Sequence, residues 1–176
     1  MKRIGLLLVL GIFCVTFATG CGSLKKKQKS PEELASLEES AIRGEDIPLE
    51  GMPEGNFVEP SDKGINGIFE DVHFDYDKSN VRQQDYPILN KIGDWLKDNE
   101  DVSIMIEGHC DERGSNEYNM ALGEQRALGT RRYLVGLGID SGRIYTVSYG
   151  EEKPLDPGHT ESSWVKNRRA HFLVSK

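Results

Sequence analysis

The sequence predicts an α/β fold, an α+β sandwich in which helices lie on one face of a mixed four-stranded sheet. Two kinds of pattern predict it: short alternating or apolar runs, typical of strands, and two longer segments with apolar residues at helical spacing. They occur in the order β-α-β-α-β-β between residues 67 and 176, and the chain contains no internal repeat. One layer of helices packed on one sheet accommodates that order.

The first strand is predicted at residues 68–74, and the polar residues 75–80 form the loop that follows it. The first helix is predicted from apolar residues spaced by four, three and one positions, which share an inward face. Pro87 lies near its first turn, where a missing backbone N–H costs least. The inward residues are Ile88, Ile92, Trp95 and Leu96.

The second half of the region continues the alternation of strands and helices. Residues 102–107 alternate between apolar and polar side chains, which predicts a half-buried strand. The second helix is predicted over residues 116–137 and ends at Gly138, a residue type favoured just after helix C-termini. Two more strands follow at residues 144–149 and 170–174, joined by a loop rich in glycine and proline.

Composition restricts the classes of partner. The 176 residues include 29 acidic and 22 basic side chains, and the net charge is −7 at pH 7. This excess of acid argues against nucleic acid or anionic lipid as the main partner. Of the three cysteines, only Cys110 lies in the region of the predicted fold, so no disulfide framework is expected.

Residues 1–20 have the features of a secretory signal peptide. They combine a basic start, an apolar run at residues 4–18 that is too short to span a bilayer, and small residues at its end. Small residues directly before Cys21 resemble the lipobox of bacterial lipoproteins, which predicts lipidation of that cysteine. Gly22 stands where an aspartate would resemble an inner-membrane retention signal, so the outer membrane is the expected destination. The alternative is ordinary secretion, with Cys21 incidental.

Residues 21–66 are predicted to form the lipidated N-terminus and a tether. From residue 22 onwards they show no sustained apolar periodicity, carry many glutamates, and have prolines at positions 31, 48, 53 and 60. Such a segment buries too little apolar surface to offset the entropy of ordering, so we expect disorder or transient helix. The folded domain is therefore predicted to span residues 67–176.

Candidate binding residues lie in and before the second helix. On a helical wheel, Arg126 and Asn119 point in the same direction as Leu122, towards the predicted sheet. A guanidinium on an inward face requires an anionic partner, because an unpaired buried charge costs several kcal/mol. Asp111, in the loop before the helix, is the predicted partner. A structural Asp–Arg bridge without a ligand is the alternative that this pattern leaves open.

The neighbouring residues His109, Cys110, Asp111 and Glu112 do not predict a metal site. Adjacent strand-end side chains alternate in direction, and no second His/Cys pair has zinc-ligand spacing. We interpret Cys110 as a small packing residue. No acidic residue lies in an apolar context that would raise its pKa for acid–base catalysis. We therefore expect a binding protein that is not an enzyme and that needs no metal and no cofactor.

Several spaced motifs closely resemble the OmpA-like peptidoglycan-binding domain family over about residues 67–176. The match begins at residues 72–78 and continues through the glycine-flanked segment 108–114 into the second helix at residues 117–127. Two further motifs lie at residues 147–154 and 166–170. The lipobox and the tether resemble those of the lipid-anchored members of this family.

The resemblance implies noncovalent binding of meso-diaminopimelate, a residue of the cell-wall stem peptide that carries an ammonium and a carboxylate. Asp111 matches the family aspartate that holds the ammonium, and Arg126 matches the arginine that pairs with the carboxylate, for which a planar guanidinium is well shaped. Cys110 stands where the family commonly has alanine or another small residue. The positions that match further pocket-lining residues are Tyr76, Asp77, Asn119 and Leu122.

The resemblance also implies an outer-membrane lipoprotein whose domain faces the periplasm and links the membrane to peptidoglycan. It implies the periplasmic protein TolB and other Tol proteins as partners, with a role in envelope integrity and cell division. A cell-wall anchor outside any Tol system and a periplasmic cell-wall hydrolase are the two alternatives.

Overall fold

The structure is a computed structural model that describes residues 57–65 and 67–175. These residues fall within one compact unit of the chain. The predicted signal peptide, Cys21 and the tether up to residue 56 lie outside the described residues. In the part of the chain that is described, no helix is both long and apolar enough to cross a membrane.

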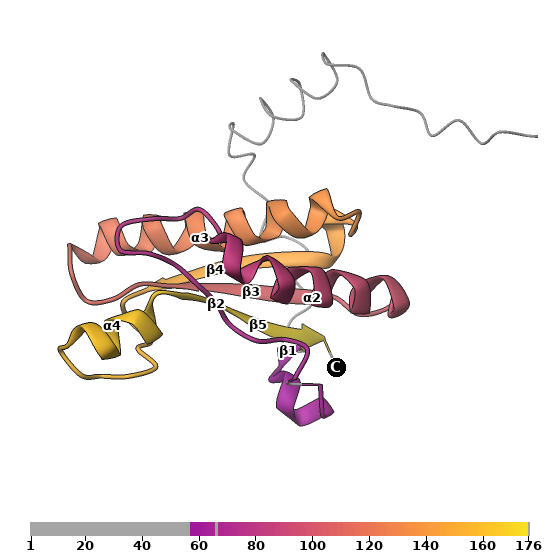
Figure 1. Ribbon diagram of the computed structural model, residues 1–176, viewed down its shortest axis with the longest axis horizontal. Coiled ribbons are helices and arrows are strands. Elements are labelled where there is room, and N and C mark those ends of the chain that lie inside the picture. Colours follow the sequence, from indigo (N-terminus) through magenta and orange to yellow (C-terminus); the bar gives the residue numbers. More distant parts are fainter. Residues whose placement is uncertain (1–56, 66, 176) are drawn as a thin grey trace, which may run out of the picture. The chain divides into compact units, whose positions relative to one another are not determined.

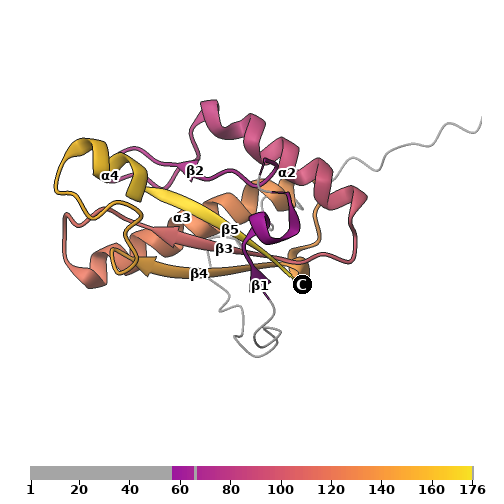
Figure 2. The ribbon, with the colours of Figure 1, turned by 90° about the horizontal axis from the view of Figure 1, so that it is seen from below.

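Five strands form one mixed sheet in the described part of the chain. The central strands are β5 (Arg169–Ser175) and β3 (Ile104–His109), which pair antiparallel, and β4 (Ile144–Gly150) pairs in parallel with β3. Two short strands, β1 (Phe57–Val58) and β2 (Val72–His73), pair antiparallel with the opposite ends of β5. Figure 2 shows β4, β3 and β5 side by side.

Three helices accompany the sheet: α2 (Tyr86–Asp98), α3 (Asn116–Gly136) and α4 (Glu161–Asn167). α3 packs across β3 and β4, and α2 packs beside α3. Figure 1 shows α2 and α3 on the same face of the sheet, with α4 at one end of the molecule. The predicted α/β fold, with its two long helices on one face of a mixed sheet, is confirmed.

Both ends of α3 and the proline in the first turn of α2 follow the rules expected for helix termini. The Ser115 side chain accepts a hydrogen bond from the Tyr118 amide at 3.2 Å, which satisfies a free N–H of the first turn of α3. α3 ends before Gly138, whose φ of 98° lies in the left-handed region that glycine favours. Pro87 lies in the first turn of α2, as predicted.

The structure differs from the sequence prediction in three details. The sheet has a fifth strand, because β1 and the 3-10 helix Pro60–Lys63 lie in a segment assigned to the tether, and pairing with β5 orders a stretch too short to show periodicity. The first predicted strand pairs only at Val72 and His73, since the amides of Ile68 and Phe69 donate to the Ile65 carbonyl in a turn. α4 forms in a segment predicted as loop, and its seven residues are too few for a recognisable stripe.

The apolar core lies between the two long helices and the sheet. A close backbone contact holds α3 against the sheet. A Cβ atom on Gly108 of β3 would overlap the Gly123 carbonyl, and a Cβ atom on Gly123 of α3 would overlap the Gly108 carbonyl. Only glycine at both positions allows the backbones this near. The contact fixes the first half of α3 against the end of β3. Fully buried core residues include Val72, Leu89, Ile92, Leu96, Ile104, Ile106, Leu134, Phe172 and Val174.

Candidate ligand-binding site

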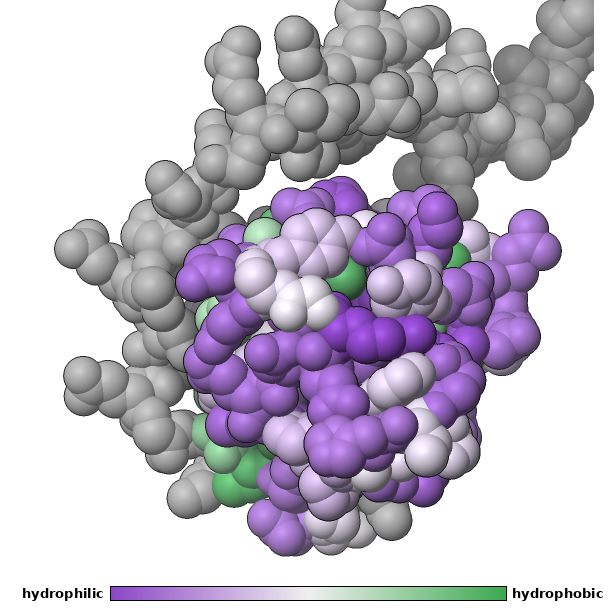
Figure 3. Space-filling view, turned by 90° about the vertical axis from the view of Figure 1, so that its left-hand side faces the viewer, coloured by the Kyte–Doolittle hydropathy of each residue, from purple (hydrophilic) through white to green (hydrophobic). Residues whose placement is uncertain are grey.

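A pocket lies where the end of β3, the first half of α3 and the loop after β2 meet. Figure 3 shows this end of the molecule, whose surface is mostly hydrophilic. The cavity volume is about 20 Å³, which holds roughly one water molecule. The structure brings all six predicted site residues together in the lining and adds Cys110, Arg113 and Tyr118. The six are Asp111, Arg126, Tyr76, Asp77, Asn119 and Leu122.

The helix α3 supplies three of these residues from a buried face that is largely polar. Arg126 and Asn119 are each 1% exposed and face inward, as the helical wheel predicted. Thr130 and Gly123 share this buried face, whereas Leu122 lies at its edge, half-buried in the pocket wall. Ala127 and Leu134 continue this face into the core, but its first half is polar, which is unusual for a core-facing helix and places hydrogen-bonding groups beside the pocket.

The Arg126 guanidinium is held by backbone carbonyls. Its Nε donates to the Lys78 carbonyl at 2.9 Å, Nη1 to the His109 carbonyl at 2.7 Å, and Nη2 to the Asp75 carbonyl at 3.4 Å. Nη1 also lies 3.3 Å from the Cys110 sulfur, which leaves one N–H of Nη2 without a partner among the described residues. Burial lowers the pKa of this guanidinium, and no carboxylate of the described residues forms an ion pair with it.

Asp111 is 4% exposed and pairs with two other arginines. It accepts hydrogen bonds from Arg113 through Nε at 3.1 Å, Nη2 at 2.7 Å and the backbone N–H at 3.1 Å, and from Arg168 Nη1 at 3.1 Å. Burial alone would raise the pKa of this carboxyl, but these bonds outweigh it and lower the pKa. The predicted direct Asp111–Arg126 pair was therefore wrong, because Asp111 is already neutralised by Arg113 and Arg168.

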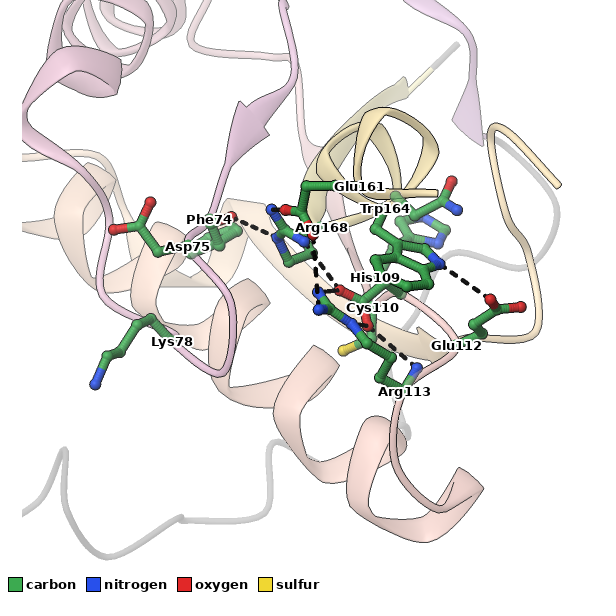
Figure 4. A network of polar contacts seen from close by, with 12 residues as sticks. Phe74, Asp75, Lys78, His109, Cys110, Glu112, Arg113, Glu161, Trp164 and Arg168 are labelled. Atoms are coloured by element: carbon green, nitrogen blue, oxygen red, sulfur yellow. Dashed lines mark hydrogen bonds and ion pairs between the residues drawn. The ribbon is translucent and has the colours of Figure 1, made fainter. Parts of the chain in front are cut away.

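Arg113 closes the pocket over Asp111. Its guanidinium carbon lies 3.9 Å from the centre of the Tyr76 ring and 4.2 Å from that of Trp164, so the planar group stacks between two aromatic faces. Its side chain is 29% exposed and also lies 3.6 Å from a Glu161 oxygen. Figure 4 shows Arg113 and Arg168 converging on the same carboxylate from different elements.

Arg168 and α4 form a support behind Asp111 that sequence reasoning missed. Arg168 donates to Glu161 at 2.7 Å and to the Phe74 carbonyl at 3.2 Å, which fixes its guanidinium behind the pocket (Figure 4). The Trp164 indole donates to Glu112 at 3.0 Å, and that bond is the main cause of the lowered pKa of Glu112. The only sequence signal for this support was the motif at residues 166–170, which indicated the family but not the contact.

The rim of the pocket is aromatic and polar. Tyr76 and Tyr118 are 56% and 51% exposed, and the Tyr118 hydroxyl donates to Asp77. Asp77 has a φ of 56°, in the left-handed region that side chains other than glycine adopt infrequently. Deeper in the pocket, the Asn119 amide donates to Glu151 at 2.6 Å and to the Arg113 carbonyl at 3.3 Å. The rim therefore offers both ring faces and hydrogen-bonding groups to a ligand.

Cys110 and His109, the thiol and the imidazole at the end of β3, both take part in packing contacts. Burial raises the pKa of the Cys110 thiol to about 11, so at neutral pH it carries its proton and is a poor nucleophile. Cys110 donates to the Asn119 carbonyl at 3.3 Å, consistent with a packing role. His109 lies on the other side of the strand, stacked on Tyr149. Within residues 57–65 and 67–175, no group of His, Cys, Asp and Glu residues is arranged to hold a metal ion.

The OmpA family model matches residues 73–168, the part of the chain that forms this fold and pocket, so the domain is of the OmpA type. The peptidoglycan-associated lipoprotein of Mesorhizobium japonicum is 32% identical over 167 residues, which cover 95% of this chain and 90% of that protein. That of Haemophilus influenzae is 44% identical over 99 residues, which cover 56% of this chain and 65% of that protein, less than two thirds of its length. The chain belongs to the OmpA family and, within it, to the peptidoglycan-associated lipoproteins.

Solved structures agree with this assignment. The crystal structure of the peptidoglycan-associated lipoprotein from Burkholderia pseudomallei has a TM-score of 0.59 and 42% identity, and it covers 60% of this chain and 89% of that chain. The C-terminal domain of Helicobacter pylori MotB shares the fold at a TM-score of 0.57 with 19% identity, over 61% of this chain and 84% of that domain.

Proposed function

We propose that this protein is an outer-membrane lipoprotein that binds peptidoglycan noncovalently through the meso-diaminopimelate of the stem peptide. The observation that carries the proposal is the buried Arg126, whose guanidinium is held by backbone carbonyls, lacks a carboxylate partner in the described structure and keeps an N–H free at the pocket. A buried charge without a counter-ion costs stability, so its presence indicates an anionic ligand group.

The ligand's carboxylate is proposed to bind Arg126. The free N–H of Nη2 is proposed to supply a charge-assisted hydrogen bond to an oxygen of the ligand in the pocket, whose lining includes Leu122 and Asp77. The surrounding carbonyls fix the guanidinium in position, so little side-chain entropy is lost when the ligand binds. Arg126 therefore acts as a prearranged cationic anchor.

The ligand's ammonium is proposed to reach Asp111 by replacing Arg113. The Asp111 oxygens already accept four hydrogen bonds, about as many as a carboxylate can accept, so an ammonium can bond to them only if one of the present donors leaves. Arg168 lies behind Asp111 and is almost fully buried, whereas Arg113 is partly exposed, so Arg113 is the donor proposed to move aside. Exchange of one cation for another keeps the Asp111 carboxylate neutralised throughout.

The lipid anchor and the partners complete the proposal. Lipidation of Cys21 and the segment up to residue 56 are proposed to hold the domain at the periplasmic side of the outer membrane, where it links that membrane to the cell wall. By resemblance to the family, the protein is proposed to work in the Tol–Pal system with TolB and other Tol proteins, in envelope integrity and cell division. The names of its relatives support the cell-wall and lipid parts of this proposal.

A sedimentation assay with purified cell wall tests the ligand site. The chain from residue 22 onwards, without its lipid, is expected to sediment with the wall and to be released by free meso-diaminopimelate. An Asp111→Ala, Arg126→Ala double variant should remain in solution. Glu124→Ala, on the exposed side of α3, is the matched control and should bind normally.

The outcomes separate the parts of the proposal. Failure of the parent chain to sediment would reject peptidoglycan as the ligand. Normal sedimentation of a folded double variant would reject the pocket while keeping the ligand. Capture of the chain by purified TolB tests the Tol partner by itself, and no capture would favour a cell-wall anchor that works outside a Tol system.

A further inference from the structure

The segment that leads into the domain is attached to the edge of the sheet by a short ladder and by side-chain packing, which includes the Phe57 ring against Tyr145 and the buried Pro60. We call residues 57–65 the strap; it contains β1 and the 3-10 helix Pro60–Lys63. Its ladder with β5 comprises two residue pairs, Phe57 with Ser175 and Val58 with Val174. Val58 and Ile65 pack at the border of the core. A two-residue ladder is marginal by itself, so side-chain contacts contribute much of the attachment.

His171 of β5 bonds to two carboxylates at once. Its Nδ1 lies 2.7 Å from Asp71 Oδ1, and its Nε2 lies 3.1 Å from Glu59 Oε2, which belongs to the strap. An ionised carboxylate only accepts hydrogen bonds, and a neutral imidazole has a single N–H to donate. Both bonds can therefore form together only when His171 carries two protons and a positive charge.

The groups around His171 favour that charged form. Glu107 of β3 lies opposite His171 in the ladder, which adds a third carboxylate to Asp71 and Glu59. Arg169, two residues earlier, lies 3.3 Å from Asp71, and buried His109 next to Glu107 has a lowered pKa and stays uncharged near neutral pH. Burial would lower the pKa of His171, but the bond to Asp71 and the nearby carboxylates outweigh it and raise the pKa.

We propose that His171 is a pH-dependent latch that fastens the strap to the sheet. Below its folded pKa the imidazolium bridges Asp71 and Glu59, and as the pH rises through that value one of the two bonds is lost. The bond to Asp71 is shorter and better shielded, with 22% of that side chain exposed against 54% for Glu59. The strap is therefore the part whose attachment weakens, so that it detaches more often.

Release of the strap changes the reach of the domain. Detached residues 57–65 add a stretch of about 30 Å, at roughly 3.3 Å for each extended residue, between residue 56 and the sheet. This consequence for distance from the membrane rests on the proposed lipid anchor, whereas the latch itself does not. The strap pairs with the C-terminal end of β5, whereas the pocket lies near the N-terminal end of β5, where β2 pairs. Ligand binding and strap release are therefore separable.

Hydrogen exchange and a histidine titration by NMR test the latch on the chain from residue 22 onwards. His171 should titrate above its ordinary pKa of 6.5. Protection factors of the strap amides should fall about three- to tenfold as the pH rises through that titration, the range expected for losing one half-exposed charged hydrogen bond. Core amides of β3 provide the reference and should show no matching step.

Variants identify the groups responsible. Glu59→Gln should remove the pH step, because its amide can donate to a neutral imidazole and accept from a charged one. Asp71→Asn should lower the pKa of His171, and Glu124→Gln, on the exposed side of α3, should leave both observations unchanged. The latch is refuted if His171 titrates at or below its ordinary pKa, if strap protection shows no step, or if Glu59→Gln retains the full step.

Discussion

Replacement of Gly123 by alanine is expected to destabilise the domain and to weaken ligand binding together. The added Cβ would overlap the Ser148 hydroxyl and come within 2.9 Å of the Gly108 carbonyl. Overpacking of this kind costs about 1–3 kcal/mol. We take the upper end because a strand carbonyl cannot move aside, and subtract about 1 kcal/mol for the better helix propensity of alanine. The net loss is about 2 kcal/mol.

That loss corresponds to a fall in Tm of about 8 °C for a domain of this size. Thermal unfolding followed by circular dichroism measures it, and sedimentation with cell wall well below Tm measures binding. Gly136→Ala is the matched control in the same helix, because Gly136 is exposed and a Cβ there meets no atom within 4 Å. It should stabilise the domain by about 0.5 kcal/mol, since alanine loses less entropy than glycine in a helix.

The two variants are expected to shift Tm in opposite directions, so the prediction can fail in either one. If Gly123→Ala melts at or above the Tm of the parent chain, the close contact between α3 and β3 does not constrain the backbone. If it melts lower but binds cell wall normally, the position of α3 does not set the geometry of the site. Only a joint loss supports the conclusion that this contact holds Arg126 and Asn119 in place.

Further predictions concern stability, pH and access to the pocket. Arg143→Ala should lower the free energy of unfolding in urea by about 2–3 kcal/mol, because its guanidinium bonds to three carbonyls at the end of α2 and before β3; Arg132→Ala, exposed on α3, is the control, and equal losses would contradict the argument. The lowered pKa of Asp111 means that its ionised form stabilises the fold above its ordinary value of 3.8, and that this stability is lost as the pH falls through the lower folded value. Asp111→Asn should therefore flatten the acid limb of the stability curve, and an unchanged limb would show that the ion pairs contribute nothing. The Cys110 thiol should react slowly with a small alkylating reagent, since it is buried with a pKa of about 11. Free meso-diaminopimelate should slow the reaction further and Arg113→Ala should speed it, whereas equal rates with and without the amino acid would exclude entry at this pocket.

Element types were predictable where periodicity was long enough to detect. The stripe in α2 comes from burial against one neighbour, so it appears in the sequence. The alternation before Gly108 predicted a strand correctly, but the strand is not half-buried: all six residues of β3 are buried, because α3 covers one face and Glu107 and His109 are also enclosed. β1 and α4 have two and seven residues, and their order depends on pairing and capping contacts with distant parts of the chain. No local pattern specifies such contacts.

Six of the nine residues that line the pocket were predicted, but the pairing of its charges was not. The helical wheel placed Arg126 inward correctly, because direction on a helix follows from spacing alone. The choice of partner for Asp111 depended on tertiary structure: Arg168 lies 57 residues away in sequence, and Arg113 reaches back over its own loop. Arg113 and Arg168 pair with Asp111, whereas the carbonyls of the chain hold the Arg126 guanidinium.

The two charges of the proposed ligand therefore meet unequal conditions in the pocket. A carboxylate that reaches Arg126 supplies a counter-ion that the described structure lacks. An ammonium that reaches Asp111 gains only the difference between its own bonds and those that Arg113 gives up. Because affinity is the surplus over what the free protein already has, the carboxylate supplies most of the net binding free energy. The ammonium supplies specificity. A ligand without an ammonium either leaves Arg113 in the site, or displaces Arg113 without forming new bonds to Asp111.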